Sequence, residues 1–499
     1  MARGQAGGHR PVPVAGLWRA LVLTLASAVV WGVAHVAAGR RAAGFALMGL
    51  LVLLVGGAAT LGLAFQEKLK QIAVQGTWLN VIIAALLALA LVWVSVVIRS
   101  YQVVRPVGLP TAMRVASMTL VVVLSLLICA PFVYAANTTY VLRDTLSKIF
   151  PGDDTSGPKI NASDPWKNIP RLNVLLLGGD GGKDRTGIRT DSMTVASIDT
   201  HTGNTVLISL PRNLRFFQVP ARLRSIWPNG YRNVNAQLGY DGMLNSVYLS
   251  GEKNPSLVPG FKKGQRGPHL LEEVIGNLID LKINYYVLAN LDGFKDIVNA
   301  MGGVTVHVEK ALPIGGEIAN GHYTKQPTGW LKPGTQHLNG EKALWYGRSR
   351  DADDDFFRMD RQKCLMKDIA DQADPQKVVT HFEKLAEAAT KTISTNLPAA
   401  LLPPLVKLSG IVKGGADITS LAFNPYKIKG FGTDNPNVPL MRRLTARTIS
   451  ASTQPKPTPS PTTTVKKRRT KRKTSPTASP TAGTTAASNG SVSLKNVCG

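Results

Sequence analysis

Apolar residues are concentrated in the first third of the chain, in four runs separated by short polar segments that carry most of the charge there. Each run has about the twenty residues that a helix needs to cross the hydrocarbon core of a bilayer. The fourth run is followed by a segment with Pro, Gly, Asp and Ser, residues typical of a linker. We therefore predict a cytoplasmic N-terminus at residues 1–17, a helical membrane region at 18–136 and a linker at 137–170; the four runs are residues 18–39, 43–65, 78–98 and 115–135.

The positions of arginine around these runs predict which of them cross the membrane. Arginines precede the first run, follow it at Arg40 and Arg41, and recur between the third and fourth runs. Because basic residues stay on the cytoplasmic side, the first run is expected to lie in the interface or to re-enter the membrane. Three crossings then place the rest of the chain on the extracellular face; the alternative is four true spans and a weaker charge rule.

Short apolar runs beyond the linker predict buried strands. LNVLLLGGD, SMTVASID and TVLISL are rich in Val, Ile and Leu, and the turn sequence HTGN separates the second from the third. Segments with helical spacing, such as HLLEEVIGNLID and DGFKDIVNAMG, alternate with further strand-like runs. This alternation predicts an α/β domain at residues 171–410, followed by an extension of that domain at 411–450.

Composition and charge bear mainly on the end of the chain. The 499 residues include 58 Lys or Arg and 31 Asp or Glu, and part of the resulting charge of +27 lies in the run KKRRTKRK at residues 466–473. Its surroundings are rich in Pro, Thr and Ser and cannot bury a core, so residues 451–499 are predicted to be disordered. Outside the membrane, anionic wall polymers or lipid headgroups are nearer partners for this run than nucleic acid.

The chain has three cysteines, at positions 129, 364 and 498. Their spacing matches no zinc site, and they are too few for a disulfide scaffold. Cys129 lies in a predicted membrane span. Cys364 and Cys498 are both expected outside the cell, where disulfides persist. The sequence is compatible with a disulfide between them and with two independent thiols.

Charged residues gather between the first two predicted strands. Asp180 ends the first strand, and Arg189 stands two residues before Asp191. Neighbouring carboxylates repel each other unless a cation or an arginine lies between them. The group suits Mg²⁺ or Mn²⁺ bridging to a phosphate, with arginine on the remaining oxygens; the alternative is a polar hairpin loop on the surface.

A second group of arginines predicts an anion site. Arg212 ends the third strand, and the segment LWYGRSRDADDDFFRMDRQ supplies four more arginines. Arg348 and Arg350 are expected to alternate on a strand, whereas Arg358 and Arg361 are one helical turn apart. Converging guanidinium groups suit a pyrophosphate; the alternative is a solvated face paired with nearby aspartates.

Taken together and in order, these motifs resemble the LytR-CpsA-Psr family of bacterial cell-wall assembly. The resemblance rests on NVLLLGGD, RTDSMTVASID, SLPRN, RNVNAQLGYDG, LKPGTQHLNGEKALWYGRSR and FRMDRQ, and covers about residues 172–361. It implies an α/β domain with a central mixed sheet flanked by helices, and transfer of a glycopolymer from a polyprenyl-pyrophosphate carrier to peptidoglycan through a phosphodiester. The residues it implies are Asp180 and Asp191 for the metal, Arg189, Asp191, Arg212, Arg348 and Arg350 for catalysis, and Asn235, Arg358, Arg361 and Gln362 for substrate binding.

The sequence departs from this family at two positions and leaves alternatives open. Asn213 stands where many members have Asp, and Phe357 where many have Gly. Asp191 and Asp360 are both conceivable as the general base. The alternatives are a non-catalytic protein that binds polyprenyl-pyrophosphate or wall polymer, and a pyrophosphatase in which water attacks. A membrane-bound transcription regulator is disfavoured because no helix-turn-helix with a basic face is present.

Overall fold

The computed structural model divides the chain into two compact units, and each is described by itself. The first contains the N-terminal helices, and the second contains the β-sheets. The residues that the structure describes are 14–150, 165–167, 169–180, 189–232, 234–235, 240–319, 322–349, 355–372, 382–453, 491–493 and 498.

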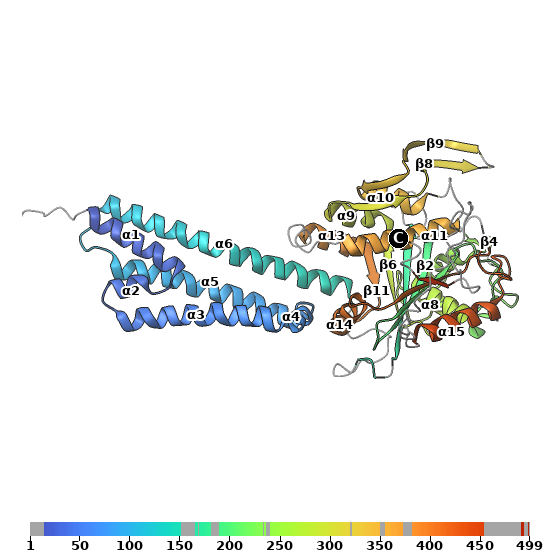
Figure 1. Cartoon of the computed structure of the whole chain (residues 1–499), viewed down its shortest axis with the longest axis horizontal. Helices are drawn as coiled ribbons and strands as arrows, with labels where there is room; N and C mark the ends of the chain where they lie inside the picture. Colours follow the sequence, from blue (N-terminus) through green and yellow to red (C-terminus); the bar gives the residue numbers. More distant parts are fainter. Residues whose placement is uncertain are drawn as a thin grey trace, which may run out of the picture. The chain divides into compact units, whose positions relative to one another are not determined.

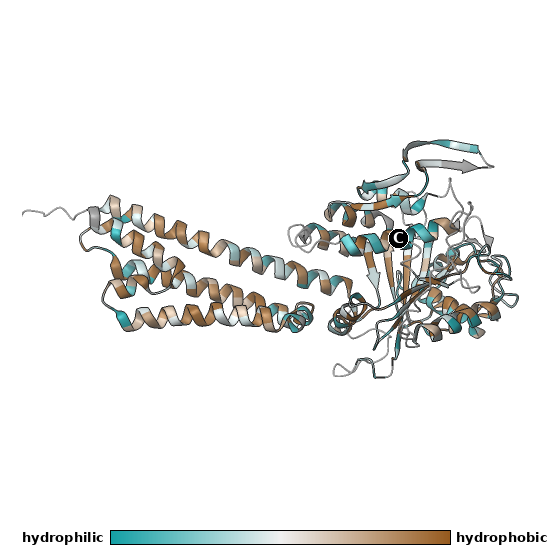
Figure 2. Cartoon of the chain, viewed as in Figure 1, coloured by the Kyte–Doolittle hydropathy of each residue, from teal (hydrophilic) through white to brown (hydrophobic). Residues whose placement is uncertain are grey.

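Within the described residues, the first unit holds three helices long and apolar enough to cross a membrane. Most of their apolar side chains are exposed. In the helix at Arg41–Ala64, no residue of the most apolar stretch is buried. Figure 2 shows the same apolar character along these helices. Their bounds are α3 (Arg41–Ala64), α5 (Gly76–Val104) and α6 (Thr111–Ile149), with the short α4 (Gln66–Ile72) after α3.

The first predicted segment is not one continuous helix. It is divided into α1 (Val14–Val29) and α2 (Val33–Ala37). Gly32 precedes α2 with a left-handed φ of 91°, and a Cβ there would lie 2.2 Å from the carbonyl oxygen of Gly44. Only glycine fits such a position. Neither piece reaches the length of a full span, and the expectation that this segment does not cross stays a prediction.

The linker prediction is wrong in its first part, because α6 continues through residues 137–149. These residues contain neither Gly nor Pro, so nothing in them ends a helix. The first proline after the membrane segment's Pro131 is Pro151, immediately beyond the helix. Residues 151–164 of the predicted linker lie outside the described part of the chain.

The second unit is built on a seven-stranded sheet with the order β11-β6-β1-β2-β3-β12-β13 (Figure 1). The three predicted strands form its antiparallel centre, as β1 (Arg171–Asp180), β2 (Arg189–Asp199) and β3 (Thr205–Leu210). Two strands join parallel to this centre, β6 (Tyr285–Asn290) and β12 (Ile418–Ala422), and two antiparallel strands form the edges, β11 (Ile393–Thr395) and β13 (Ser491–Ser493). The predicted mixed α/β sheet is therefore confirmed.

One face of this sheet is apolar. Met193, Val195, Ile208 and Leu210 point from β2 and β3 into a core with α8 (Arg266–Ile279) and α15 (Val438–Thr453). Strand β12 also contributes to this core, so residues 411–450 are an integral part of the domain and not an extension added to it. The same side carries α7 (Val247–Lys253) and the 3-10 turns Ala221–Leu223, Leu244–Ser246 and Pro255–Leu257. Elsewhere in this unit, β4 (Val234–Asn235) pairs with β5 (Tyr240–Asp241).

The opposite side carries helices around a smaller apolar core that includes Val298, Leu338, Ala343 and Leu365. One of the further strand-like runs, GVTVHVE at residues 303–309, is not part of the central sheet: β7 (Val304–Val308) pairs with β10 (Gly334–Leu338) in a ladder of its own. A second ladder joins β8 (Leu312–Ala319) to β9 (His322–Leu331). The helices are α9 (Leu291–Ala300), α10 (Gly340–Arg348), α11 (Asp355–Gln372) and α13 (Phe382–Thr392); Ala399–Leu401 and α14 (Leu402–Lys413) follow in sequence.

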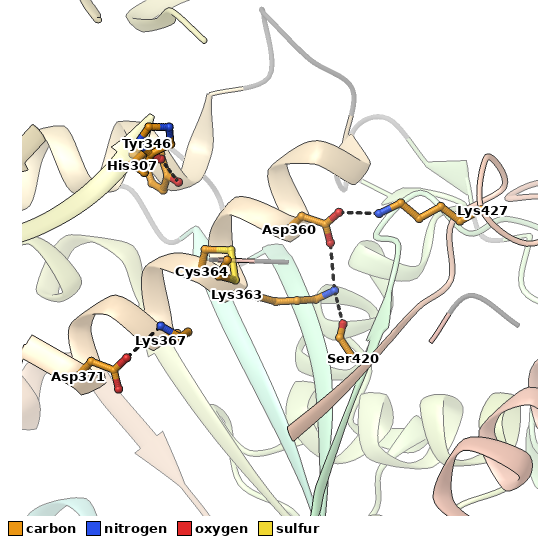
Figure 3. Close-up of a disulfide and its surroundings, with 10 residues drawn as sticks. His307, Tyr346, Asp360, Lys363, Cys364, Lys367, Asp371, Ser420 and Lys427 are labelled. Atoms are coloured by element: carbon orange, nitrogen blue, oxygen red, sulfur yellow. Dashed lines mark hydrogen bonds and ion pairs between the residues drawn. A yellow bond between two sulfur atoms is a disulfide. The ribbon is translucent and has the colours of Figure 1, made fainter. Parts of the chain in front are cut away.

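The prediction of a disordered C-terminal segment is wrong at its end. Val492 of β13 lies opposite Ser420 of β12, so the chain returns to the sheet. Cys498 forms a disulfide with Cys364 of α11, with 5.3 Å between their Cα atoms (Figure 3). Local composition could not reveal these contacts because both partners are distant in sequence. The basic run at 466–473 lies outside the described residues.

Candidate active site

The predicted acidic pair lies where β1 ends and β2 begins. Gly179 pairs with Thr190, but Gly178 pairs with Ser192, so Asp191 is the extra residue of a β-bulge. Bulges turn one side chain away from the regular alternation and are common beside active sites. Asp191 therefore has no partner in β1, and its side chain departs from the regular alternation of β2 near the end of the hairpin.

Three of the predicted residues meet at Asp191. The Asp191 carboxylate accepts a hydrogen bond of 2.5 Å from Arg212, which follows β3, and both side chains are about one-fifth exposed, at 19% and 21%. Arg358 of α11 donates to the Asp191 carbonyl oxygen at 2.9 Å and is only 3% exposed. Tertiary structure therefore brings together a carboxylate and two arginines that are far apart in the sequence.

The other predicted residues of α11 contact the end of α10. Arg361 donates to the carbonyl oxygens of Tyr346, at 3.1 Å, and Ser349, at 2.5 Å, and Gln362 donates to Gly347 at 2.9 Å. These carbonyls belong to the last turn of a helix, which lacks internal donors. Arg361 and Gln362 therefore join α10 to α11; their predicted contacts with substrate stay a prediction.

The strand predicted for Arg348 is wrong. Asn339 caps a helix by accepting from the Lys342 backbone at 3.0 Å, and the helix continues to Arg348. The Arg348 guanidinium lies over the Trp345 ring, 5.4 Å from its centroid. Arg350 lies outside the described residues, so its position relative to Arg348 stays a prediction.

The structure describes the other three predicted residues only in their backbone. Asp180 is the last residue of β1 and lies opposite Arg189, the first of β2. Asn235 lies in β4, opposite Tyr240. The positions of these three side chains are outside the described part of the chain.

The residues around Asp191 fit a magnesium or manganese ion in their chemistry. The ligands available are oxygen atoms, which hard divalent cations prefer. Thr190 Oγ1, adjacent to Asp191 in the sequence, is buried and has no hydrogen-bond partner among the described residues. Those residues contain no cluster of three His, Cys, Asp or Glu side chains, and the side chain of the second predicted ligand, Asp180, lies outside them.

Sequence reasoning missed a buried lysine beside this site. Lys363 is 3% exposed, and its Nζ lies 3.3 Å from Asp360 and 2.9 Å from the Ser420 hydroxyl of β12 (Figure 3). Burial lowers the pKa of Lys363, against the opposing effect of the Asp360 carboxylate. The signal was its spacing, because Lys363 shares a helix face with Met359 and Met366, and all three line one small cavity.

The two candidate bases differ in their surroundings. Asp360 is held between Lys363 and Lys427, with the latter at 3.1 Å. Asp191 lies at the arginine cluster itself. Tyr346 is excluded as a base near neutral pH, because burial raises its pKa to about 12. Both carboxylates are thus paired with basic side chains, and the assignment of the base stays a prediction.

The fold and this site together define an α/β domain with an arginine and carboxylate cluster suited to phosphorylated ligands. The family model for LytR_cpsA_psr matches residues 138–437, more than half of the chain. The chain therefore belongs to the LytR_cpsA_psr family.

Several characterised proteins are similar to this chain. Biofilm regulatory protein A of Streptococcus mutans is 27% identical over 309 residues, which are 60% of this chain and 66% of that protein. The polyisoprenyl-teichoic acid–peptidoglycan teichoic acid transferase TagV of Bacillus subtilis is 26% identical over 230 residues, 45% of this chain and 50% of that protein. Both matches span less than two thirds of the relative. The crystal structure of Bacillus subtilis TagV aligns at 23% identity and a TM-score of 0.39, covering 56% of this chain and 97% of that one.

Proposed function

We propose that this protein transfers a glycopolymer from a polyprenyl-pyrophosphate carrier to peptidoglycan and joins the two through a phosphodiester. The observation that carries the proposal is the convergence of Arg212 and Arg358 on Asp191. One arginine on the Asp191 carboxylate and a second on its backbone carbonyl gather positive charge at one place, which suits a pyrophosphate better than a neutral ligand. Family membership supports the proposal, and so do relatives named as teichoic acid transferases.

In this reaction a peptidoglycan hydroxyl attacks the phosphorus that carries the glycopolymer. A new P–O bond forms while the bond to the oxygen bridging to the lipid-side phosphorus breaks, and polyprenyl phosphate leaves. The hydroxyl proton passes to a base, for which we propose Asp191. No covalent intermediate with the protein is needed, because phosphoryl transfer depends mainly on positioning and on neutralising charge.

The arginines supply the charge that this step requires. Negative charge develops on the leaving phosphate, and a guanidinium held in advance stabilises it without reorganisation. Arg358 is suited to this because it is almost fully buried and fixed by the Asp191 carbonyl. Mg²⁺ or Mn²⁺, when bound by Asp180 and Asp191 beside Arg189, would neutralise further charge on the phosphates.

We also propose that the second unit lies on the extracellular face of a membrane that the first unit crosses with α3, α5 and α6. The arginine distribution supports three crossings. The Cys364–Cys498 disulfide supports the extracellular location, since disulfides are rare in the cytoplasm. Peptidoglycan is available on that side.

The test uses the full chain in detergent micelles with a short polyprenyl-pyrophosphate-linked sugar and a peptidoglycan acceptor, with and without Mg²⁺. We expect release of polyprenyl phosphate together with phosphodiester-linked sugar on the acceptor. Both products should be lost in Asp191→Ala and Arg189→Ala. Lys391→Ala is the matched control, because this lysine of α13 is 69% exposed and its ion pair is with Glu387 of the same helix.

The two alternatives give different products. Release of polyprenyl phosphate without linked sugar, whatever acceptor is present, would identify a pyrophosphatase. Tight binding of the lipid without turnover, under every metal and acceptor condition, would identify a docking protein. Either result would contradict the transferase.

A further inference from the structure

The helix that carries Arg358 and Arg361 is joined to the last two strands of the sheet, β12 and β13, in two ways. The first link is direct: Lys363 of α11 donates to the Ser420 hydroxyl of β12 at 2.9 Å. The second link runs through the end of the chain, since Cys364 is bonded to Cys498 and β13 pairs with β12. Figure 3 shows the disulfide beside the Lys363 side chain.

These two links meet at one place on β12. Ser420, which accepts from Lys363, is also the residue opposite Val492 of β13. Lys363 and Cys364 are adjacent, so the helix, the end of the chain and β12 form a closed ring of contacts. The ring connects to the site directly, because Arg361 and Gln362 precede Lys363 in the same helical turn.

We propose that β13 and Cys498 form a C-terminal clamp that holds α11 in place, so that Arg358 and Arg361 stay aligned for phosphoryl transfer. This inference rests on the proposed function and adds positioning residues to it. The clamp acts through α11 and touches no substrate.

The physical reason for such a clamp lies in the surroundings of α11. Its direct contact with β12 is made by a charged side chain, Lys363, which is only 3% exposed. The buried Lys363 contributes no net stability to the fold, because burying a charge is costly even when the charge is paired. A covalent link has no such cost and limits the positions that the helix can adopt. Small displacements of positioned groups can lower rates by large factors.

The test compares the full-length wild type with the Cys364→Ser/Cys498→Ser variant in the transfer assay, in thermal unfolding and in amide hydrogen exchange. We expect kcat to fall at least tenfold while KM changes by less than about twofold, as for interactions needed in the transition state. Tm should fall by roughly 5–10 °C. Exchange should become faster in α11 and β12 and stay unchanged in α8.

A matched variant separates positioning from general stability. Val274→Ala removes a fully buried side chain from α8, on the opposite face of the sheet. It should lower Tm by a comparable amount without changing kcat. If the double serine variant lowers Tm but keeps the wild-type kcat, the disulfide is only a stabilising crosslink and the clamp is refuted.

Reduction provides an independent arm on unmutated protein. A dithiol reagent gives two electrons and two protons to the Cys364 and Cys498 sulfurs and becomes a disulfide itself. It should lower kcat in the wild type and in Cys129→Ser, and change nothing in the double serine variant. Two free thiols at Cys364 and Cys498 in peptide maps of untreated protein would overturn the proposal.

The exchange measurement keeps the clamp testable if the proposed function fails. Should the wild type show no turnover with any acceptor or metal, the transferase is refuted, but exchange still reports on α11. Faster exchange in α11 of the double serine variant then supports the clamp, and unchanged exchange refutes it.

Discussion

The two faces of the central sheet are covered by contacts of different chemistry. On one face, Met193 and Ile208 pack against α8 and α15 in a continuous apolar core. On the other face, Thr194 and Ser209 share a hydrogen bond of 3.1 Å, and Lys363 reaches Ser420 from α11. In Figure 1, α8 and α15 lie on one side of the strands and α11 on the other.

This difference separates stability from positioning. Apolar contacts have little directional preference, so the first face stabilises the fold while tolerating small shifts of its helices. The second face has a smaller apolar core that includes Leu365 of α11, and its hydrogen bonds, ion pair and disulfide are directional, so they fix the orientation of that helix. The arginines of the site are on that helix. Variants of the first face should therefore change the free energy of unfolding, and variants of the second face should change kcat.

The largest expected effect is in the site itself. Arg212→Gln removes the guanidinium that binds the Asp191 carboxylate at 2.5 Å. We expect kcat to fall by roughly 10²–10³, as for the loss of one group that stabilises transition-state charge. Because the pair is partly exposed, the free energy of unfolding should change by less than about 1 kcal/mol. Transfer kinetics and urea unfolding of the same preparation measure both.

Asp191→Asn sharpens this prediction. The amide retains the size of the side chain and loses its charge, so metal binding and proton transfer should both suffer. A loss smaller than tenfold in both variants would show that the cluster is not the reaction centre.

On the apolar face, Leu271→Ala should affect stability. Leu271 of α8 is 0% exposed within the core, and such truncations cost about 2–5 kcal/mol. Unfolding by urea measures this loss, and kcat at a temperature well below Tm should stay within about twofold of wild type. Leu271→Met, which nearly conserves volume, is the matched control and should cost less than about 1.5 kcal/mol. A large fall in kcat for Leu271→Ala would break the separation of the two faces.

Much of the sheet could be predicted from the sequence because its strands are locally marked. β1 and β3 are short apolar runs, β2 carries its apolar residues between Ser and Thr, and a short turn joins the second to the third. The alternation of Arg348 and Arg350 has a period of two and so predicts a strand. The cap at Asn339, nine residues earlier, decided for helix. β13 was not predicted because its partner, β12, is distant in the sequence.

The site could be predicted in its residue types but not in its contacts. Charge patterns and the family resemblance pointed to Asp191, Arg212 and Arg358, whereas their mutual distances depend on tertiary structure. Lys363 was passed over because a lysine in a charged helix usually faces solvent. Its apolar neighbours on the same face, Met359 and Met366, were the available sign of burial.

A smaller effect is expected for the buried lysine. Burial lowers the pKa of Lys363, so the folded state binds fewer protons than the unfolded state, and the charge destabilises the fold at pH values below the ordinary pKa of 10.5. Lys363→Met should therefore leave the free energy of unfolding at neutral pH unchanged or raise it. It should still lower kcat by roughly tenfold, because α11 loses its direct link to Ser420.

The control for this variant uses the second lysine of Asp360. Lys427 is 49% exposed and lies 3.1 Å from the same carboxylate, so Lys427→Met should change kcat by less than about twofold. Wild-type kcat in Lys363→Met, measured in the same transfer assay, would show that the lysine does not orient α11.

The smallest effect is expected at the turn between β2 and β3, far from Asp191 along β2. This turn belongs to neither face. Asp199 accepts hydrogen bonds from the His201 and Thr202 backbones at 3.0 and 2.9 Å. Burial raises the pKa of Asp199, but these bonds and Arg171 outweigh it, so the pKa lies below its ordinary value of 3.8. A lowered pKa contributes stability that is present above the ordinary value and is lost as the pH falls through the lowered one.

Asp199→Asn should cost about 1 kcal/mol at neutral pH, make stability less dependent on pH below about 4, and leave kcat unchanged. Urea unfolding across that pH range checks this, and a fall in kcat of tenfold or more would mean that the turn is coupled to the site through the strands.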